Sequence, residues 1–478
     1  MRLSSVQRLW RKGAIVALPL AAAALFGLGA PPVVLAADNP TVVDHEHRIQ
    51  ELEDTIKQLK KDERQLEVNT ENQKPLAGWD NGFYISSADG NNKLKIGGYT
   101  QLDGRFFLDD KNSSLTNQFL FRRARLDISG TVFKYFDFRI LPDFAQPNSS
   151  SSVVLFDAFV VGNFIPEIKP LVGKFKPPVG LERLQSAKAL LFVERAQPTN
   201  LVPNRDFGGQ LFGDLLNGAF SYQLAVVNGV PDNVNPTSGD ANDDKDFDGR
   251  IFTVPFKDAP IDVLKGLGLG VAGSYGRQRG NTSTTDTPTY KTFGQATYFA
   301  YKGAVAATST TPAQGPTIAY GERSRYAPQA YYYFGPLGLF GEYVDSTQGV
   351  KRDNKTESLA NNAWQVAASF VVTGEAASYN GVVPANPFDP FTGKWGAFEI
   401  AGRYGQLEVD TGAFKNGYAD PSTSARRDKE WVVGGNWYLN RAIKLSLDYA
   451  NSDFLGGAPK NGDRSTEKAI VGQVQLAF

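Results

Sequence analysis

Residues 466–478 read TEKAIVGQVQLAF, and this stretch decides the fold. Its side chains alternate between two faces, as they do along a β-strand. One face is apolar throughout and ends in an aromatic residue: Ile470, Gly472, Val474, Leu476 and Phe478. The other face consists of small, amide and valine side chains: Ala469, Val471, Gln473, Gln475 and Ala477. This pattern is typical of the last strand of an outer-membrane β-barrel, whose two faces meet lipid and a wet lumen. A soluble sandwich strand can alternate in the same way, so the prediction depends on the rest of the chain.

A similar alternation begins at residue 93. Residues 93–108 carry Leu, Ile, Gly and Phe on one face and mostly Lys, Tyr, Gln, Asp and Arg on the other. Such a strand is too long for a small sandwich, and its second face is too charged for a core. The alternation predicts sixteen strands, an even number as in bacterial barrels. These are 93–108, 119–133, 134–144, 153–163, 168–176, 206–214, 218–228, 247–256, 266–277, 325–334, 336–346, 362–374, 395–410, 429–438, 441–452 and 467–478.

The connections between the predicted strands alternate between short and long. Asn217-Gly218, Gly335-Pro336 and Asn440-Arg441 mark short connections on one side. The opposite connections include long segments rich in Gly, Thr and Asn, such as 278–324, whereas 375–394 is long where a turn is expected. Sixteen strands leave an aqueous channel rather than a filled core. The region before residue 93 is too short for the plug of a 22-stranded transporter.

The N-terminus has the pattern of a secretory signal peptide. Four basic residues precede an apolar stretch at 13–29, and small residues favour cleavage before Ala37. Loss of residues 1–36 would remove four basic and no acidic residues from a chain with 50 of each, leaving a net charge of −4. This charge gives no support for nucleic-acid binding. The chain has no cysteine, so no disulfide is expected.

Residues 42–68 carry apolar residues three and four apart between charged and Gln positions. The pattern predicts a short coiled coil, within a periplasmic segment 37–75. Ile and Leu at the core positions nominally favour two strands, whereas porins usually form trimers, and about four heptads leave this open. The alternative is a single amphipathic helix that lies on its own barrel. Residues 76–92 then form a linker or short hairpin, and 93–478 the barrel, so the predicted fold class is an all-β, 16-stranded antiparallel transmembrane β-barrel with a short N-terminal helix.

The sequence contains few motifs that would indicate an enzyme or a metal site. The two histidines, His45 and His47, both lie in the heptad segment, so no His-dependent catalytic pair is expected in the barrel. The glycines of 268–273 spell GxGxxG inside an alternating strand, without the helix that a dinucleotide site needs. Residues 244–249 spell DxDxDG, but Pro255 stands where an EF-hand has its bidentate Glu. We therefore expect a solvated acidic external loop. Surface calcium, or cations that bridge lipopolysaccharide, are the alternative for Asp244, Asp246 and Asp248, and no cofactor is predicted.

Six segments together resemble the phosphate-selective porin O/P family: KIGGYTQLDGRF, FLFRRARLDISG, LFDAFVV, VGKFKPPVGLERLQSAKALLFVER, WGAFEIAGRY and NWYLNRAIKLSLDYANSDF. The resemblance runs through about residues 83–478. It implies a homotrimeric outer-membrane porin with its third external loop folded into the lumen, in contact with membrane lipid and lipopolysaccharide. It also implies selection of small anions such as phosphate by the residues that match the family's motifs: Arg122, Arg123, Asp157, Arg183 and Arg195.

Two departures weaken the expectation of phosphate specificity. Phosphate-specific members carry an arginine where this chain has Tyr99. Their arginine-rich fifth loop corresponds to the Thr-rich segment 278–324, which contains only Arg279 and Arg323 and few lysines.

The residues of the third loop support anion passage independently of the resemblance. The segment 172–195 carries Lys174, Lys176, Arg183, Lys188 and Arg195 against Glu182 and Glu194. This positive excess in a narrow opening favours anions, because charge effects grow as the effective dielectric falls. On the neighbouring strand 119–133, alternation turns Arg123 and Arg125 to the lumen, where Asp127 offsets part of their positive charge. The same alternation turns Arg122 toward lipid, unless this residue lies at the rim or at a subunit contact.

An alternative gives these cations a scaffold role. They can pair with lumen-facing acids of the wall and only hold the loop in place; the candidates are Asp137, Asp143, Asp157 and Glu399. The sequence thus predicts a porin for passive diffusion of small solutes, anion-preferring. Two other functions stay open: a structural anchor that tethers the envelope through the coiled coil, with the cell wall as a partner, or a general non-selective porin.

Overall fold

The computed structural model describes residues 42–71, 76–108, 115–145, 153–236, 240, 242–310 and 312–478. The predicted signal peptide lies outside them. The chain divides into two compact units, Met1–Asn72 and Gln73–Phe478.

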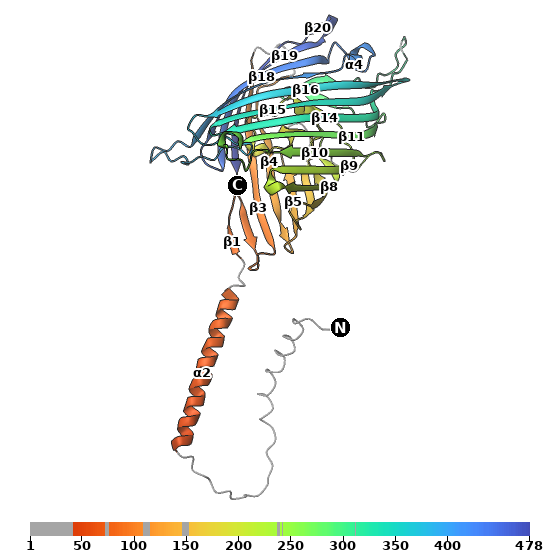
Figure 1. Ribbon diagram of the computed structural model, residues 1–478. Helices are drawn as coiled ribbons and strands as arrows, with labels where there is room; N and C mark the ends of the chain where they lie inside the picture. The colour runs from red at the N-terminus through yellow and green to blue at the C-terminus, as the bar shows by residue number, and fades with distance from the viewer. Residues whose placement is uncertain are drawn as a thin grey trace. The chain divides into compact units, whose positions relative to one another are not determined.

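The described part of the first unit is one helix, α2, which spans Val42–Glu71 (Figure 1). The helix itself was predicted from the heptad pattern, and this prediction is confirmed. Ile49, Leu52, Ile56 and Leu59 are 51–62% exposed along one stripe. Self-association through that stripe stays a prediction. None of the described helices is both long and apolar enough to cross a bilayer.

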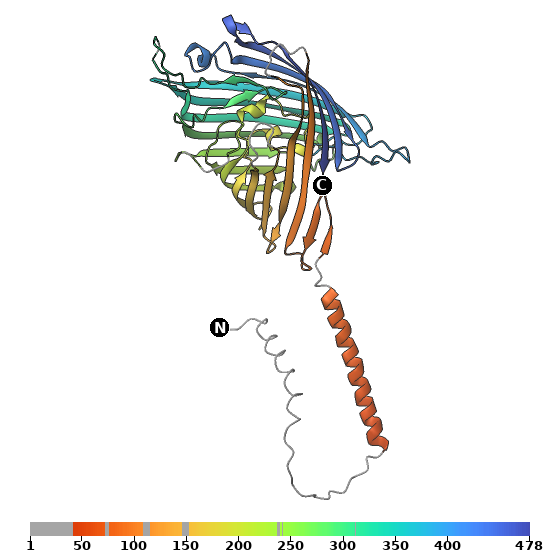
Figure 2. The same cartoon turned by 180° about the vertical axis from the view of Figure 1, so that it is seen from behind.

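The second unit contains a closed antiparallel barrel of sixteen strands, each at one of the sixteen predicted positions (Figures 1 and 2). Pairing of β21 with β3 closes the ring. The barrel strands are β3 (Lys93–Leu108), β4 (Gln118–Val132), β5 (Phe136–Asp143), β6 (Val154–Gly162), β7 (Lys169–Phe175), β8 (Asp206–Leu215), β9 (Phe220–Val227), β10 (Asp246–Thr253), β11 (Leu267–Arg279), β14 (Ile318–Phe334), β15 (Leu337–Arg352), β16 (Lys355–Val371), β17 (Ala397–Glu408), β18 (Ala425–Tyr438), β19 (Ile443–Ala458) and β21 (Glu467–Ala477).

Shorter elements lie outside the ring of sixteen. Strands β1 (Leu76–Trp79) and β2 (Phe83–Ser86) form a hairpin whose second strand pairs with β3. The loops contain β12 (Thr289–Lys291), β13 (Thr297–Ala300), β20 (Gly462–Asp463), α3 (Leu181–Leu184), α4 (Gly412–Lys415) and several turns of 3₁₀ helix.

The two faces of β21 have the environments that its sequence predicts. Val474 and Leu476 are 50% and 46% exposed on the outer face, where a barrel meets lipid. Val471, Gln473 and Gln475 are buried on the lumen face. The GxGxxG glycines lie inside β11, where the sequence pattern also placed them.

Several strands extend beyond their predicted ends. The largest difference is at β15 and β16, which pair as far as Arg352 and Lys355, so that a two-residue turn stands where the sequence predicted a loop of residues 347–361. This end carries polar and charged side chains on both faces, and the apolar alternation that identifies a strand in lipid is therefore missing.

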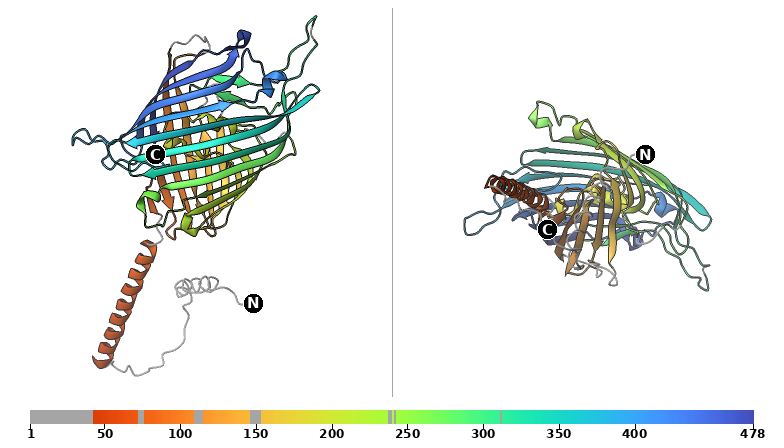
Figure 3. Two further views of the ribbon diagram at one scale, coloured as in Figure 1. Left: turned by 45° about the horizontal axis from the view of Figure 1, so that its top comes forward. Right: turned by 90° about the horizontal axis from the view of Figure 1, so that it is seen from below.

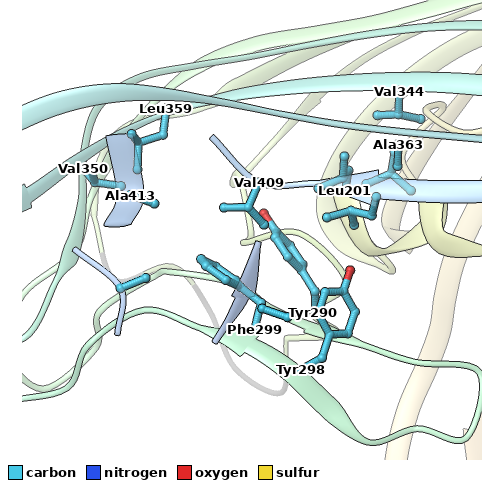
Figure 4. Close-up of a cluster of buried hydrophobic side chains, with 14 of the residues drawn as sticks. Leu201, Tyr290, Tyr298, Phe299, Val344, Val350, Leu359, Ala363, Val409 and Ala413 are labelled. Carbon is cyan, nitrogen blue, oxygen red and sulfur yellow. The ribbon is translucent and has the colours of Figure 1, made fainter. Parts of the chain in front are cut away.

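Two connections, which we call loop 3 (176–205) and loop 5 (280–317), pack against the lumen side of the wall. A third, 372–396, projects away from the barrel at its tip (Figure 3), where Phe391 is 97% exposed, while Tyr379 in its first half contacts loop 3. Tyr290 and Phe299 of loop 5 stack at 5.2 Å and pack in one buried cluster with wall residues such as Val350 and Leu359 (Figure 4). Loop 5 thus brings an apolar core of its own to this part of the wall.

Candidate functional site

Loop 3 is attached to one side of the barrel wall. Its backbone N–H groups donate to wall carboxylates: Leu181 N to Glu342 at 2.6 Å, and Val193 N to Asp448 at 2.7 Å. Loop carbonyls accept from the same side, including Leu190 O from Lys444 Nζ at 2.9 Å. The acids of strands β15–β19 thus satisfy backbone groups of the loop, and they are covered by it.

The acids of loop 3 pair with arginines of the wall. The Glu194 carboxylate receives Arg122 Nε at 2.5 Å and Arg105 at 2.6 Å, and lies 3.8 Å from Arg123. Burial alone would raise the pKa of Glu194, but the charges of Arg122, Arg105 and Arg123 hold it well below its ordinary value. Glu194 is therefore an ionised anchor between the loop and strands β3 and β4.

On its other side, loop 3 faces a water-accessible cavity of about 340 Å³ that borders strands β3–β8. Eight basic side chains and one acidic side chain line it: Arg122, Arg123, Arg125, Arg139, Lys176, Arg183, Arg195, Arg205 and Asp157. Seven of the nine site residues predicted from sequence are among these nine. Loop 3 thus covers wall acids on one side and borders a cavity lined mostly by cations on the other.

Arg122 reaches the cavity through a β-bulge. In the pairing of β3 with β4, Gln101 lies opposite Arg123 and Leu102 lies opposite Phe121, so Arg122 is an extra residue. An inserted residue interrupts the alternation of faces. Arg122 and Arg123 therefore both point inward, and the prediction that Arg122 faces lipid is wrong.

A second bulge lies in β6. Leu141 pairs with Asp157 and Pro142 pairs with Leu155, which leaves Phe156 as the extra residue. Phe156 and Asp157 both line the cavity as a result. Regular alternation would have turned Phe156 to the lipid.

Three cations of loop 3 that line the cavity have neutral partners. Lys176 Nζ donates to the carbonyls of Leu184 and Gln185, both at 2.9 Å. Arg195 donates to the carbonyls of Glu182 and Gln185, at 3.0 and 2.8 Å. Burial lowers the pKa of Lys176 well below its ordinary value, and nearby arginine charges lower it further.

Arg183 completes this set. It donates to Thr199 O at 2.6 Å and to the side chains of Asn204 and Asn233 at 3.2 and 2.7 Å. Across the described residues, no carboxylate lies within 4.0 Å of the charged nitrogens of Lys176, Arg183 or Arg195. These three cations therefore do not make the pairs with wall acids that the alternative scaffold role requires.

Three further arginines of the cavity, two on the wall and Arg205 at the end of loop 3, have carboxylate partners. Arg125 pairs with Asp143 at 2.7 Å, Arg139 with Asp127 at 2.7 Å, and Arg205 with Asp157 at 2.6 Å. Arg139 and Arg205 were missed in the sequence. Arg139 lies two residues after Asp137 in the same strand, so the alternation that places Asp137 in the lumen also places Arg139 there. Arg205 ends an irregular loop, where alternation gives no information.

Two predicted site residues lie elsewhere. Lys174 Nζ donates to Leu155 O at 2.7 Å and to Pro236 O, and does not line the cavity. Lys188 lines another cavity, of about 740 Å³, together with Lys444 and the C-terminal Phe478. Lys188 Nζ lies 5.9 Å from the centre of the Tyr99 ring, which lines the main cavity.

A third cavity leads to the main one from the side of loop 5. It has a volume of about 650 Å³ and shares Arg122, Asn204 and Asn233 with the main cavity. Arg105, Lys291 and Arg464 also line it. The basic lining thus continues from this cavity into the main one.

The acids of the DxDxDG motif do not converge. Asp246 and Asp248 belong to β10, so their predicted place in an external loop is wrong. Asp246 pairs with Arg323 at 2.5 Å and Arg325 at 3.3 Å, and Asp244 lies 4.0 Å from Arg279. In the described parts of the chain, no three His, Cys, Asp or Glu side chains group as metal ligands would.

Known proteins resemble this chain over most of its length. Residues 94–478 match the family described as phosphate-selective porin O and P. Porin O of Pseudomonas aeruginosa is 24% identical over 415 residues, which cover 83% of this chain and 91% of that protein.

Solved structures share the fold. The outer membrane channel DcaP of Acinetobacter baumannii matches with a TM-score of 0.50 and 12% identity, over 84% of this chain and all of that one. An anion-selective porin from Comamonas acidovorans matches with a TM-score of 0.49 and 11% identity, over 81% of this chain and all of that one. At such identities the DcaP match concerns the barrel fold alone.

Proposed function

The chain belongs to the phosphate-selective porin O and P family and is a non-enzymatic channel of the Gram-negative outer membrane; we propose that it passes small anions, phosphate among them, by passive diffusion. Solutes move down their own gradients through the lumen, past the main cavity beside loop 3. Neither a cofactor nor an energy source takes part.

The observation that carries this proposal is the charge of the main cavity, with eight basic side chains and one acidic. Lys176, Arg183 and Arg195 donate to neutral groups, and their charge is therefore not cancelled by an adjacent carboxylate. A narrow lumen with low-dielectric walls strengthens the field of such a cluster, which concentrates anions and excludes cations.

The proposal also concerns which anions the channel prefers, and phosphate in particular. The planar forks of Arg123, Arg183 and Arg195 suit the oxygens of phosphate and carboxylate alike. Tyr99 adds no charge of its own, and its hydroxyl accepts from Arg125 at 2.8 Å. We therefore expect a preference for anions in general, with modest discrimination in favour of phosphate.

Assembly is a second part of the proposal. We propose a homotrimer in contact with outer-membrane lipid and lipopolysaccharide, with the exposed stripe of α2 as a coiled-coil contact between three copies. The segment 37–75 would then be periplasmic, and would clamp the trimer or reach toward the cell wall.

The decisive test is the reversal potential of the purified protein in a planar bilayer under a KCl gradient, repeated with added phosphate. An anion-favouring potential supports the proposal. Block by phosphate at low concentration adds a phosphate-binding constriction, whereas no such block leaves a general anion porin. A potential near zero or of cation sign refutes anion selection.

The exposed stripe of α2 favours a second candidate function, a structural anchor that tethers the envelope. In that case the protein conducts little or no current, and deletion of residues 38–75 detaches the envelope. A conducting protein whose deletion variant leaves the envelope intact excludes the anchor.

A further inference from the structure

The Phe156 ring lines the main cavity, and two guanidinium groups lie near it. Arg125 Cζ lies 3.8 Å from the centre of this ring, and Arg205 Cζ lies 5.2 Å from it. Tyr99 extends the arrangement, because its ring centre lies 5.6 Å from Arg125 Cζ. All four side chains line the same cavity. The cavity therefore offers alternating cationic and aromatic planes.

The same cavity has an apolar part. Phe159, Leu171 and Phe175 line it. They belong to an apolar cluster on the lumen side of the wall, in which Phe159 is half-buried. Small inorganic anions bind through charge and hydrogen bonds, and apolar side chains do nothing for them. A solute with both a charge and an apolar body can use both parts of the lining.

The bulge in β6 indicates that the inward ring has a role. Phe156 faces the cavity only because β6 contains one residue more than its partner strand requires. A bulge leaves a residue unpaired and disrupts the ladder, and bulges are common where a side chain is redirected toward a functional site. An aromatic ring needs no such irregularity to face lipid.

We infer that the main cavity takes organic anions with a planar apolar body, of the aromatic carboxylate class. This inference rests on the proposed anion passage and narrows its solutes. The carboxylate binds the cations of loop 3 that have neutral partners, Lys176, Arg183 and Arg195. The solute ring packs beside Phe156, whose contacts hold the guanidinium planes of Arg125 and Arg205 on which the solute ring stacks, since arginine stacks on aromatic faces.

The test compares three monovalent carboxylates as blockers of the chloride current in planar bilayers. Acetate has no apolar body, cyclohexanecarboxylate has one that is not planar, and benzoate has one that is planar. We expect benzoate to halve the current at about one tenth of the concentration that acetate requires. Cyclohexanecarboxylate should fall between them. Equal values for benzoate and acetate, or for benzoate and cyclohexanecarboxylate, overturn the inference.

Two variants locate the effect. Phe156→Leu keeps an apolar side chain but removes the ring, and should bring benzoate close to cyclohexanecarboxylate. Phe340→Leu removes a ring that stacks on Tyr379 at 6.4 Å and does not line the main cavity, so the ratio of benzoate to acetate should stay at the wild-type value. An unchanged ratio in the Phe156 variant contradicts the role of that ring.

The outcomes separate this inference from the proposed function. A cation-favouring reversal potential in KCl contradicts the proposed anion passage, whatever the block by the three carboxylates. An anion-favouring potential, with benzoate and acetate blocking at the same concentration, contradicts the organic-anion inference and leaves the proposed anion passage standing. Should the Phe156 variant fail to fold, as judged by heat-modifiable gel mobility, the wild-type series with three carboxylates still decides.

Discussion

Replacing Glu194 by Gln should increase the anion preference of the channel. The carboxylate lies beside Arg122 and Arg105, and its charge offsets part of the field at the cavity. For a passing anion about 5 Å away in a water-like dielectric of about 80, removal of that charge is worth about 0.8 kcal/mol, a factor of about four in local anion concentration. Gln keeps the shape and an acceptor oxygen, and the hydrogen bonds of Leu181 N to Glu342 and of Val193 N to Asp448 remain, so loop 3 should stay in place.

The assay is the anion-to-potassium permeability ratio from reversal potentials in planar bilayers. At 0.1 M KCl the ratio of the Glu194→Gln variant should exceed that of the wild type at least about fourfold. At 1 M KCl, where the Debye length is about 3 Å, the difference should disappear. Glu322→Gln, on the outer face of β14, removes an exposed charge outside the lumen and should change nothing. Equal ratios for the Glu194 variant and the wild type at 0.1 M would refute the electrostatic argument.

The pH dependence tests the same contact. An ordinary glutamate is half-protonated at about pH 4.3. Because its arginine partners hold the pKa of Glu194 well below that value, the carboxylate stays charged at pH 4. The difference between variant and wild type at 0.1 M KCl should therefore persist at about pH 4. Its loss there would show that Glu194 titrates normally.

Three further predictions concern loop 3 and the helix. Burial and nearby arginines lower the pKa of Lys176, and a lysine loses its charge as the pH rises through its pKa. The anion preference should therefore fall at a pH well below that at which an ordinary lysine titrates. In reversal-potential measurements, Lys176→Arg should remove this fall. Arg183→Glu combined with Arg195→Glu should abolish or reverse the anion preference, and unchanged ion selectivity would contradict control by loop 3. Deletion of residues 38–75 should leave single-channel conductance unchanged while it weakens the trimer in mild detergent, measured by light scattering.

The barrel could be predicted from the sequence because lipid imposes a strict rule. Every strand in the membrane needs one apolar face, and this rule identifies all sixteen strands and the inward side of residues such as Asp143 and Asp157. The rule fails where lipid is absent. The external ends of β15 and β16 have no apolar outer face, and their pairing was therefore missed.

The site was harder to predict for two physical reasons. Alternation assumes a regular strand, and one extra residue at Arg122 or Phe156 reverses the inferred face without leaving a mark in the composition. Partners across the lumen also depend on how irregular loops fold. No periodicity indicates that Glu194 meets Arg122, or that Arg205 meets Asp157.

The two bulges have a consequence for how this lining can change. A one-residue insertion or deletion in a regular strand turns every following side chain to the wrong face. At Arg122 and Phe156, the residues on both sides already point the way that a regular strand requires. Loss of a single codon at either point would remove a guanidinium or a ring from the pore while the wall stays closed. In this barrel, chain length as well as side-chain identity is therefore open to selection as a means of retuning the channel.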